Sequence, residues 1–210
     1  GHGALGLAFD AADRATIEAA AARVGRCDIL VNNAGILRGG PLAETSAEDW
    51  ELVLRINLTG YLGTAQAFGA GMRARQRGAI VNIASIAASE PQAFSGAYSP
   101  SKAAVAMLSR QLAFEWGPDG VRSNSVSPGM IRTPLSESFY QVPGILAARS
   151  AIVPARRVGT PQDIAHVAAF LASPRAAYVT GQDIVVDGGF AQTLMAHVPR
   201  PGHEQAEKVA

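Results

Sequence analysis

Two residues of this 210-residue chain have the types and the spacing of an acid and base pair. Tyr98 and Lys102 are four positions apart, so on a helix they project from the same face, one turn from each other. A phenol loses its proton near pH ~10 in water, and a nearby ammonium group stabilises the phenolate and lowers that pKa. The spacing therefore predicts a pair that exchanges a proton with a substrate at a pH closer to neutral; the alternative is coincidence, because tyrosine and lysine four apart occur by chance in many helices.

Ser85 and two asparagine-containing segments extend this pattern. Ser85 follows an apolar run, and open α/β sheets place ligands at the carboxyl ends of such strands; a helix cap is the structural alternative. In the run Asn32 to Gly35, small residues let the backbone approach a flat ligand, and the amides bind it or fix neighbouring strands; a simple turn is the alternative. Asn57 is a poor helix former in the middle of an otherwise good helix. A residue that opposes the local structural preference in this way indicates a functional role.

Short runs rich in β-branched residues alternate with longer segments rich in alanine and leucine. This alternation predicts parallel strands joined by crossover helices, hence an α/β fold with helices on both faces of a sheet. The predicted strands are Ala4–Phe9, Ile29–Asn32, Ala79–Ala84, Arg122–Val126 and Ile184–Val186. The predicted helices are Arg14–Val24, Ala47–Arg75, Ala97–Trp116 and Gln162–Ala172.

Taken together, these motifs resemble the compact form of the short-chain dehydrogenase/reductase family. The matching stretches, in order, are Asn32–Gly35, Asn57, Ser85, Tyr98 with Lys102, Ser127–Thr133 and Gly181–Gly189. The resemblance implies a doubly wound, Rossmann-like parallel sheet with helices on both faces. It also implies an oxidoreductase that moves a hydride between NAD or NADP and the carbon of a carbonyl or secondary alcohol.

By this resemblance, four residues are catalytic: Asn57, Ser85, Tyr98 and Lys102. Tyr98 would exchange a proton with the substrate oxygen, which Ser85 would hold. Lys102 would lower the pKa of the phenol and hydrogen-bond the nicotinamide ribose, while Asn57 would hold a water that links Lys102 to solvent. These roles agree with the chemistry of the residues, because hydride transfer to a carbonyl develops charge on its oxygen.

The resemblance also implies where a cofactor and a substrate would bind. The cofactor-binding residues would be Asp10, Asn33, Ala34, Gly35, Tyr98, Lys102, Pro128, Gly129, Ile131 and Thr133. Asp10 would lie beside the adenine, residues 33–35 along the adenosine and residues 128–133 at the nicotinamide carboxamide. Residues 133–158 would form a mobile lid, with Tyr140 joining Ser85 and Tyr98 as a substrate contact. Alternatively, the apolar side chains of this segment, Leu135 among them, pack on the sheet.

The family's glycine-rich phosphate loop is not found in this sequence, because Gly3 and Gly6 run into a predicted strand and not into the start of a helix. In the family, two strands and two helices precede the position of Asp10, so we expect about fifty residues before Gly1 in the natural protein. The sequence predicts one nucleotide-binding and catalytic domain, residues 1–190, lacking its first two strands, and a C-terminal tail, residues 191–210. The choice between NAD and NADP stays open, because the missing segment normally decides it.

The composition argues against several other classes of protein. The chain is 48% hydrophobic and 17% charged with a net charge of +1, which argues against disorder and against a nucleic-acid partner. It has no apolar run near the ~20 residues that span a membrane. The single cysteine, Cys27, is compatible with a reducing cytoplasm, and the four histidines lack metal-ligand spacing, so no metal is expected.

The expected partners are a small ketone or alcohol substrate and further copies of the chain. The resemblance implies a homo-oligomer, with a tetramer preferred, formed through the helices Ala47–Arg75 and Ala97–Trp116 and through the C-terminal strand region. One alternative is a catalytically silent scaffold of the same fold. Another is a 3-oxoacyl-[acyl carrier protein] reductase that docks its acidic partner on Arg73, Arg75 and Arg77. A sugar-nucleotide epimerase ranks last, because only about twenty residues follow Gly189.

Overall fold

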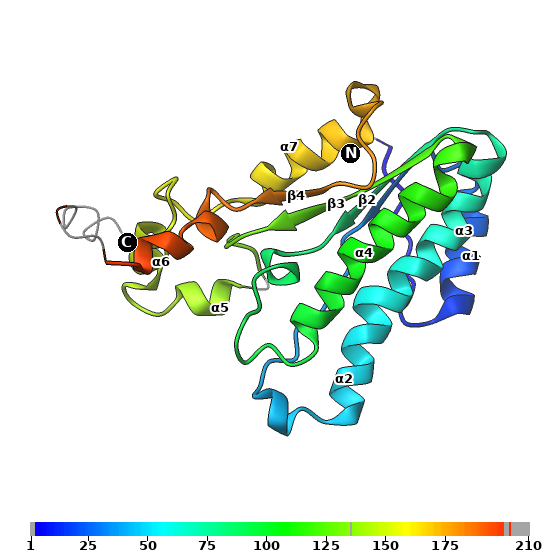
Figure 1. Ribbon diagram of the computed structural model, residues 1–210. Coiled ribbons are helices and arrows are strands. Elements are labelled where there is room, and N and C mark those ends of the chain that lie inside the picture. The colour runs from blue at the N-terminus through cyan, green and yellow to red at the C-terminus, as the bar shows by residue number, and fades with distance from the viewer. Residues whose placement is uncertain (1–2, 135, 200–201, 203–210) are drawn as a thin grey trace.

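A parallel sheet lies between two layers of helices in the computed structural model, which describes residues 3–134, 136–199 and 202 (Figure 1). The strands are β1 (Ile29–Asn32), β2 (Gly78–Ile83), β3 (Val121–Pro128) and β4 (Asp183–Val186). They lie in the order β1-β2-β3-β4, and each neighbouring pair is parallel. The predicted doubly wound α/β sheet, with helices on both faces, is confirmed.

Seven α-helices accompany the sheet in the described part of the chain. They are α1 (Arg14–Val24), α2 (Ala47–Leu54), α3 (Gly60–Ala74), α4 (Tyr98–Trp116), α5 (Glu137–Tyr140), α6 (Ile145–Ile152) and α7 (Pro161–Ala172). One turn of π-helix, Arg55–Thr59, joins α2 to α3, so the predicted helix Ala47–Arg75 is continuous but wider in its middle. Such π turns are frequent at functional sites, and this one contains Asn57. No described helix is both long enough and apolar enough to cross a membrane.

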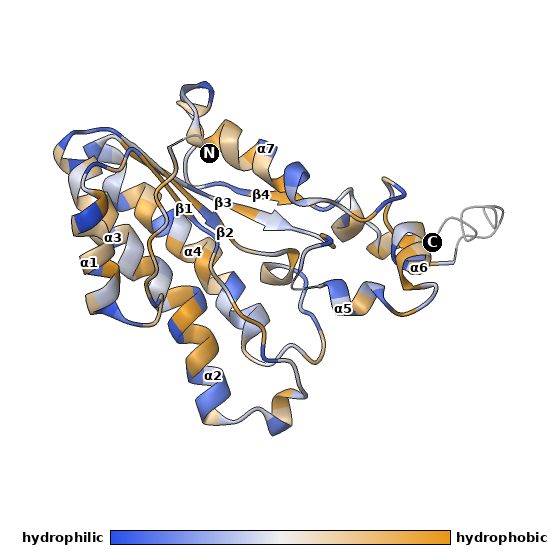
Figure 2. Cartoon of the chain, turned by 180° about the vertical axis from the view of Figure 1, so that it is seen from behind, coloured by the Kyte–Doolittle hydropathy of each residue, from blue (hydrophilic) through white to orange (hydrophobic). Residues whose placement is uncertain are grey.

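The two helical layers pack against opposite faces of the sheet because side chains alternate along a strand. Ile80 of β2 packs in a cluster with Met72 of α3 and Trp116 of α4. The next residue, Val81, packs on the other face with Leu171 of α7. Figure 2 shows hydrophobic stretches along the strands where they lie between the helices. Burial on both faces explains why β2 appears in the sequence as a nearly continuous apolar run.

A chain of buried polar side chains ties the strands to the helices. Asn32 Nδ2 donates to Asn82 Oδ1 at 2.9 Å, and Asn82 Nδ2 donates to Ser109 Oγ of α4 at 3.1 Å. Thr64 Oγ1 of α3 donates to Asn32 Oδ1 at 2.7 Å. Buried polar groups must find such partners, so Asn32 fixes neighbouring strands, which is one of the two roles predicted for the amides of its run.

The predicted strand Ala4–Phe9 is wrong. Residues 4–9 form no strand, and Leu5 and Phe9 are 65% and 43% exposed. An apolar run becomes a strand only when its backbone groups pair with a neighbour, and no strand within the described part of the chain pairs with this segment. The chain just after this segment packs closely against α3: a Cβ at Gly60 would lie only 2.5 Å from the carbonyl oxygen of Ala11.

Candidate active site

A cavity of about 380 Å³ lies at the carboxyl ends of β1, β2 and β3. The lining from the loop after β1 includes Asn33 and Gly35, and the end of β2 contributes Ile83, Ala84 and Ser85. The remaining lining residues come from the same loop, from α4, from the end of β3 and from two later segments: Ile36, Tyr98, Lys102, Pro128, Gly129, Ile131, Thr133, Ser136, Pro161 and Ile164. Residues far apart in the sequence therefore meet at the edge where parallel sheets bind their ligands.

Ser85 and Tyr98 lie together in this cavity. Ser85 has an extended backbone and its Oγ accepts from Ala87 N at 3.1 Å, so it caps the 3-10 turn Ile86–Ala88. Burial raises the pKa of Tyr98, and hydrogen bonding with Ser85 acts in the opposite direction. The expected lowering of the phenol pKa is therefore not found here, because the loss of hydration outweighs the stabilisation of the phenolate. At neutral pH the Tyr98 phenol is protonated.

Lys102 lies one helical turn along α4 with its ammonium group buried. The residue is 4% exposed, and Nζ donates to the backbone oxygen of Ile83 at 2.8 Å. Burial lowers the pKa of Lys102 to about 8, because the charged form loses its hydration. The group therefore carries its charge at neutral pH and loses it at mildly alkaline pH.

Asn57 holds the loop after β1 against the start of α4. Its Oδ1 accepts from Ile36 N at 2.9 Å, and its Nδ2 donates to Ile36 O and to Ser101 Oγ, both at 3.0 Å. A Cβ at Gly35 would lie 3.3 Å from Asn57 Oδ1 and 3.5 Å from Lys102 Nζ, so a larger residue at Gly35 would press on both groups. The π turn thus supplies an amide that joins two walls of the cavity.

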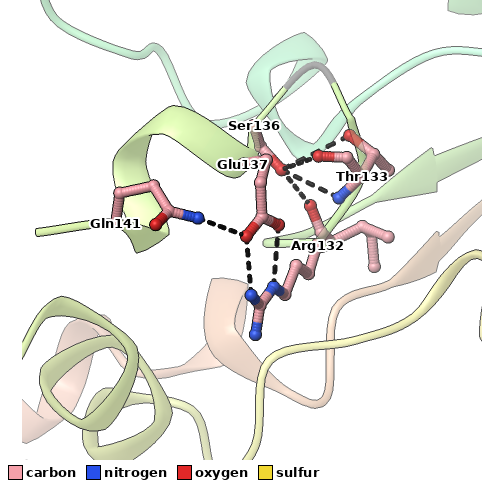
Figure 3. Close-up of polar contacts among 6 residues, drawn as sticks. Arg132, Thr133, Ser136, Glu137 and Gln141 are labelled. Carbon is pink, nitrogen blue, oxygen red and sulfur yellow. Dashed lines mark hydrogen bonds and ion pairs between the residues drawn. The ribbon is translucent and has the colours of Figure 1, made fainter.

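The segment after β3 forms another wall of the cavity. Figure 3 shows the polar contacts within this segment. The hydroxyl of Ser136 accepts from Thr133 N at 3.0 Å and donates to Ile131 O at 2.9 Å, which closes a tight turn. Arg132 forms two hydrogen bonds with Glu137 at 2.9 and 2.6 Å, and Gln141 Nε2 donates to Glu137 Oε1 at 2.9 Å. These contacts hold α5 beside the segment that carries Ile131 and Thr133.

Comparison with known proteins places this site in a family. Residues 4–191 match the family described as enoyl-(acyl carrier protein) reductase. The chain is 43% identical over 189 residues to D-threitol dehydrogenase of Mycolicibacterium smegmatis, which covers 88% of this chain and 72% of that protein. It is 40% identical over 190 residues to galactitol 2-dehydrogenase (L-tagatose-forming) of Cereibacter sphaeroides, covering 88% and 74%. The crystal structure of a gluconate 5-dehydrogenase from Burkholderia cenocepacia J2315, in complex with NADP and tartrate, matches with a TM-score of 0.83 at 36% identity, covering 88% and 74%.

The chain belongs to the short-chain dehydrogenase/reductase family. As a short-chain dehydrogenase/reductase it is an NAD- or NADP-dependent oxidoreductase that acts on an alcohol or a ketone, as the sequence predicts.

The structure brings together most of the site residues that the sequence predicts for a short-chain dehydrogenase/reductase. Asn57 lies directly behind the cavity wall through its bonds to Ile36. Asp10 and Ala34 are exposed and do not line the cavity, and the Asp10 carboxylate accepts from Ala12 N at 2.8 Å. Tyr140 does not line it either: it is 9% exposed, and its hydroxyl lacks a hydrogen-bond partner in the described chain.

Two apolar side chains of the predicted lid are exposed to solvent. Phe139 and Val142 are 49% and 54% exposed, so in this structure they are neither packed in the sheet nor part of the cavity lining. Leu135, which belongs to the same predicted lid, lies outside the described residues.

Several lining residues of this short-chain dehydrogenase/reductase were not predicted from the sequence. They are Ile36, Ile83, Ala84, Ser136, Pro161 and Ile164. Pro161 and Ile164 belong to the start of α7, where the Thr160 and Asp163 capping box explains the sequence fully as a helix start. Their second role depends on where α7 packs, which local patterns do not reveal. Among the described residues, no group of three or more metal-ligating side chains gathers anywhere.

Proposed function

We propose that this chain interconverts a secondary alcohol and a ketone. In this proposal Tyr98 is the acid and base, Ser85 binds the reacting oxygen, and Lys102 and Asn57 assist these two residues. The observation that carries the proposal is the convergence of Ser85, Tyr98 and Lys102 in one cavity at the carboxyl ends of the strands. NAD or NADP supplies or accepts the hydride when bound.

The residues around the cavity fit a flat nucleotide that approaches backbone closely. Gly35 and Gly129 line the cavity without side chains, and a Cβ at Gly35 would lie 3.5 Å from Lys102 Nζ. Lys102 Nζ has three N–H donors and uses one on the Ile83 oxygen, so it can also donate to a ribose hydroxyl. The residues we assign to cofactor binding are Asp10, Asn33, Ala34, Gly35, Tyr98, Lys102, Pro128, Gly129, Ile131 and Thr133.

The protonation state of Tyr98 gives the two directions of the reaction different pH dependences. In reduction, the neutral phenol donates its proton to the substrate oxygen while the Ser85 hydroxyl donates a hydrogen bond to the same oxygen. In oxidation, the phenolate must take the hydroxyl proton. Because burial raises the pKa of Tyr98, the oxidation rate should rise with pH, whereas reduction should already proceed at neutral pH.

The substrate that we assign is a small molecule with a secondary hydroxyl group, and a polyol is our first choice. The similarity to D-threitol dehydrogenase and to galactitol 2-dehydrogenase supports this choice, as do the polar groups of Asn33, Ser85 and Thr133 in the lining. Tyr140 remains a predicted substrate contact that requires movement of the segment carrying α5. A 3-oxoacyl thioester is the substrate that the second candidate, an acyl carrier protein-dependent reductase, would take.

Cofactor titration of the purified protein tests the proposed function. We expect the fluorescence of NADH or of NADPH to change on binding, and one of the two to bind more tightly. With the preferred oxidised cofactor, a series of polyols should give faster turnover than simple alcohols, and 3-oxoacyl thioesters with the reduced cofactor should be poor substrates. Failure of both nucleotides to bind would favour the silent scaffold, and fast turnover of the thioester would favour the reductase.

We also infer a cytoplasmic homo-oligomer, with a tetramer preferred. A groove of about 420 Å³ runs between α3 and α4, and its lining includes Leu62, Leu108 and Trp116. Phe114 on α4 is 85% exposed and Met107 is 56% exposed, so this helix presents an apolar surface that suits a second copy of the chain. The free thiol of Cys27 is consistent with a reducing compartment.

Phe114→Glu should shift the assembly towards smaller species. A carboxylate placed in an apolar interface loses its hydration without gaining a partner, so we expect dissociation by at least one step at micromolar concentration. Size-exclusion chromatography with light scattering measures this shift. Leu42→Glu is the matched control, because Leu42 is 67% exposed and lies outside α3, α4 and the C-terminal strand region. An unchanged mass for Phe114→Glu would remove α4 from the interface.

A further inference from the structure

The ammonium group of Lys102 lies between the aromatic rings of two tyrosines. Its Nζ is 5.5 Å from the centroid of the Tyr61 ring and 5.7 Å from the centroid of the Tyr98 ring. Tyr98 belongs to the proposed proton-transfer machinery, but Tyr61 comes from α3 and neither lines the cavity nor forms part of any motif recognised in the sequence. Its place beside Lys102 therefore needs a separate explanation.

A buried cation needs groups that replace its lost hydration. Around Lys102 the described residues supply one hydrogen-bond acceptor, the Ile83 oxygen, and no carboxylate forms an ion pair with it. The titratable side chains facing Nζ are Tyr61 from α3 and Tyr98 from α4. Aromatic faces within about 6 Å attract a cation, and the attraction grows where water is excluded.

The ring of Tyr61 is itself held in place. Tyr61 is 2% exposed and packs in a cluster with Ala84 and Val105, and its hydroxyl donates at 3.3 Å to Ile83 O, the same oxygen that accepts from Lys102. Burial, with the neighbouring Tyr98 adding to it, raises the pKa of Tyr61, so its phenol stays neutral. A neutral ring presents its electron-rich face to the ammonium group without competing for the proton.

We propose that Tyr61 is a positioning residue for the proposed reaction: the face of its ring holds the Lys102 ammonium group charged and at the Ile83 carbonyl, where it can serve Tyr98 and the cofactor ribose. The inference about the reaction rests on the proposed function. The placement of the ammonium group by the Tyr61 ring is testable without catalysis.

The sequence makes a direct measurement practical, because its lysines are Lys102 and Lys208 alone. With lysine labelled at 13Cε, the pH titration of the Lys102 resonance reports its protonation, and Lys208 serves as an internal reference. In the unsubstituted protein we expect a midpoint near pH 8. Tyr61→Leu should lower this midpoint by about 0.5 to 1 unit, while Tyr61→Phe, which keeps the ring, should leave it unchanged.

Two further variants keep the test decisive. Pentafluorophenylalanine in place of Tyr61 preserves the shape of the ring but removes its electron-rich face, so it should lower the Lys102 midpoint as Tyr61→Leu does. This variant provides the test if Tyr61→Leu folds poorly. Tyr178→Leu, at a fully exposed position, should change nothing. In activity assays near pH 8, Tyr61→Leu should turn over more slowly, because fewer molecules carry a charged Lys102, and Tyr61→Phe should retain the original rate.

The proposal is overturned if the Lys102 midpoint is the same in all variants, or if the phenylalanine and pentafluorophenylalanine variants shift it equally. A loss of stability without any shift would show a packing role only. If the midpoint moves as expected but Tyr98→Phe retains full turnover, the positioning of the ammonium group stands and the proposed function fails.

Discussion

Replacing Tyr98 with phenylalanine should lower kcat by about 10²- to 10⁴-fold in both directions of the reaction, the range that a positioned acid or base contributes. The ring and its packing remain, so the change removes only the proton that would move to or from the substrate oxygen. Binding of the reduced cofactor should change much less than turnover. Steady-state rates with an accepted alcohol and its ketone, together with a fluorescence titration of the cofactor, measure the two effects separately.

The burial of the phenol decides what this change does to stability. Tyr98→Phe should unfold at the same or a slightly higher urea concentration, because a buried hydroxyl costs free energy unless its hydrogen bond is good. Tyr178→Phe is the control, since that side chain is fully exposed and distant in the sequence from the cavity residues. Turnover of Tyr98→Phe at the unsubstituted rate would remove Tyr98 from the mechanism.

Replacing Lys102 with methionine should have opposite effects on activity and on stability. Turnover should fall by about 10²-fold or more, and cofactor affinity should weaken, because the ammonium group is lost to both Tyr98 and the ribose. The cofactor-free protein should become more stable by about 3 kcal/mol at neutral pH. The reason is that burial lowers the pKa of Lys102 from 10.5 to about 8, which means that burying the charged ammonium group opposes folding.

The pH dependence of this difference follows from the direction of the pKa shift. Below pH 8 the lysine is charged in both the folded and the unfolded states, so the penalty is complete. Between about pH 8 and 10.5 the folded protein releases its proton first, and the stability of the unsubstituted protein should rise towards that of Lys102→Met. Above that range the two proteins should differ only through packing.

Urea denaturation of both proteins at pH 7, 9 and 10.5 measures this convergence, and the subtraction removes all other titrating groups. Lys208→Met is the control for loss of a lysine elsewhere in the sequence. A constant stability difference across these pH values would contradict the buried, charged Lys102. If Lys102→Met lost activity but was only as stable as the unsubstituted protein, Lys102 would act in the reaction while the burial of its charge would not oppose folding.

Most of the sheet and the helices could be predicted because their signals are local. β1 (Ile29–Asn32) and α1 (Arg14–Val24) have the bounds predicted from β-branched and alanine-rich runs. The prediction failed at residues 4–9, where an apolar run without any β-branched residue has no partner strand in the described chain. Composition reports what a segment prefers, whereas a strand also needs a neighbour to accept its hydrogen bonds.

In the candidate site, too, some features follow from local sequence and others depend on tertiary packing. The spacing of Tyr98 and Lys102 is a property of one helix, so the sequence by itself determined that the two share a face, and the order of the motifs determined the family. Only the tertiary structure decided that Lys102 meets Ile83 and Tyr61, that the Tyr98 pKa moves up, and that Pro161 and Ile164 close the cavity. Helix spacing depends on the periodicity of neighbouring residues, but burial and ring contacts depend on which distant segments pack together, and that is settled by the folded chain alone.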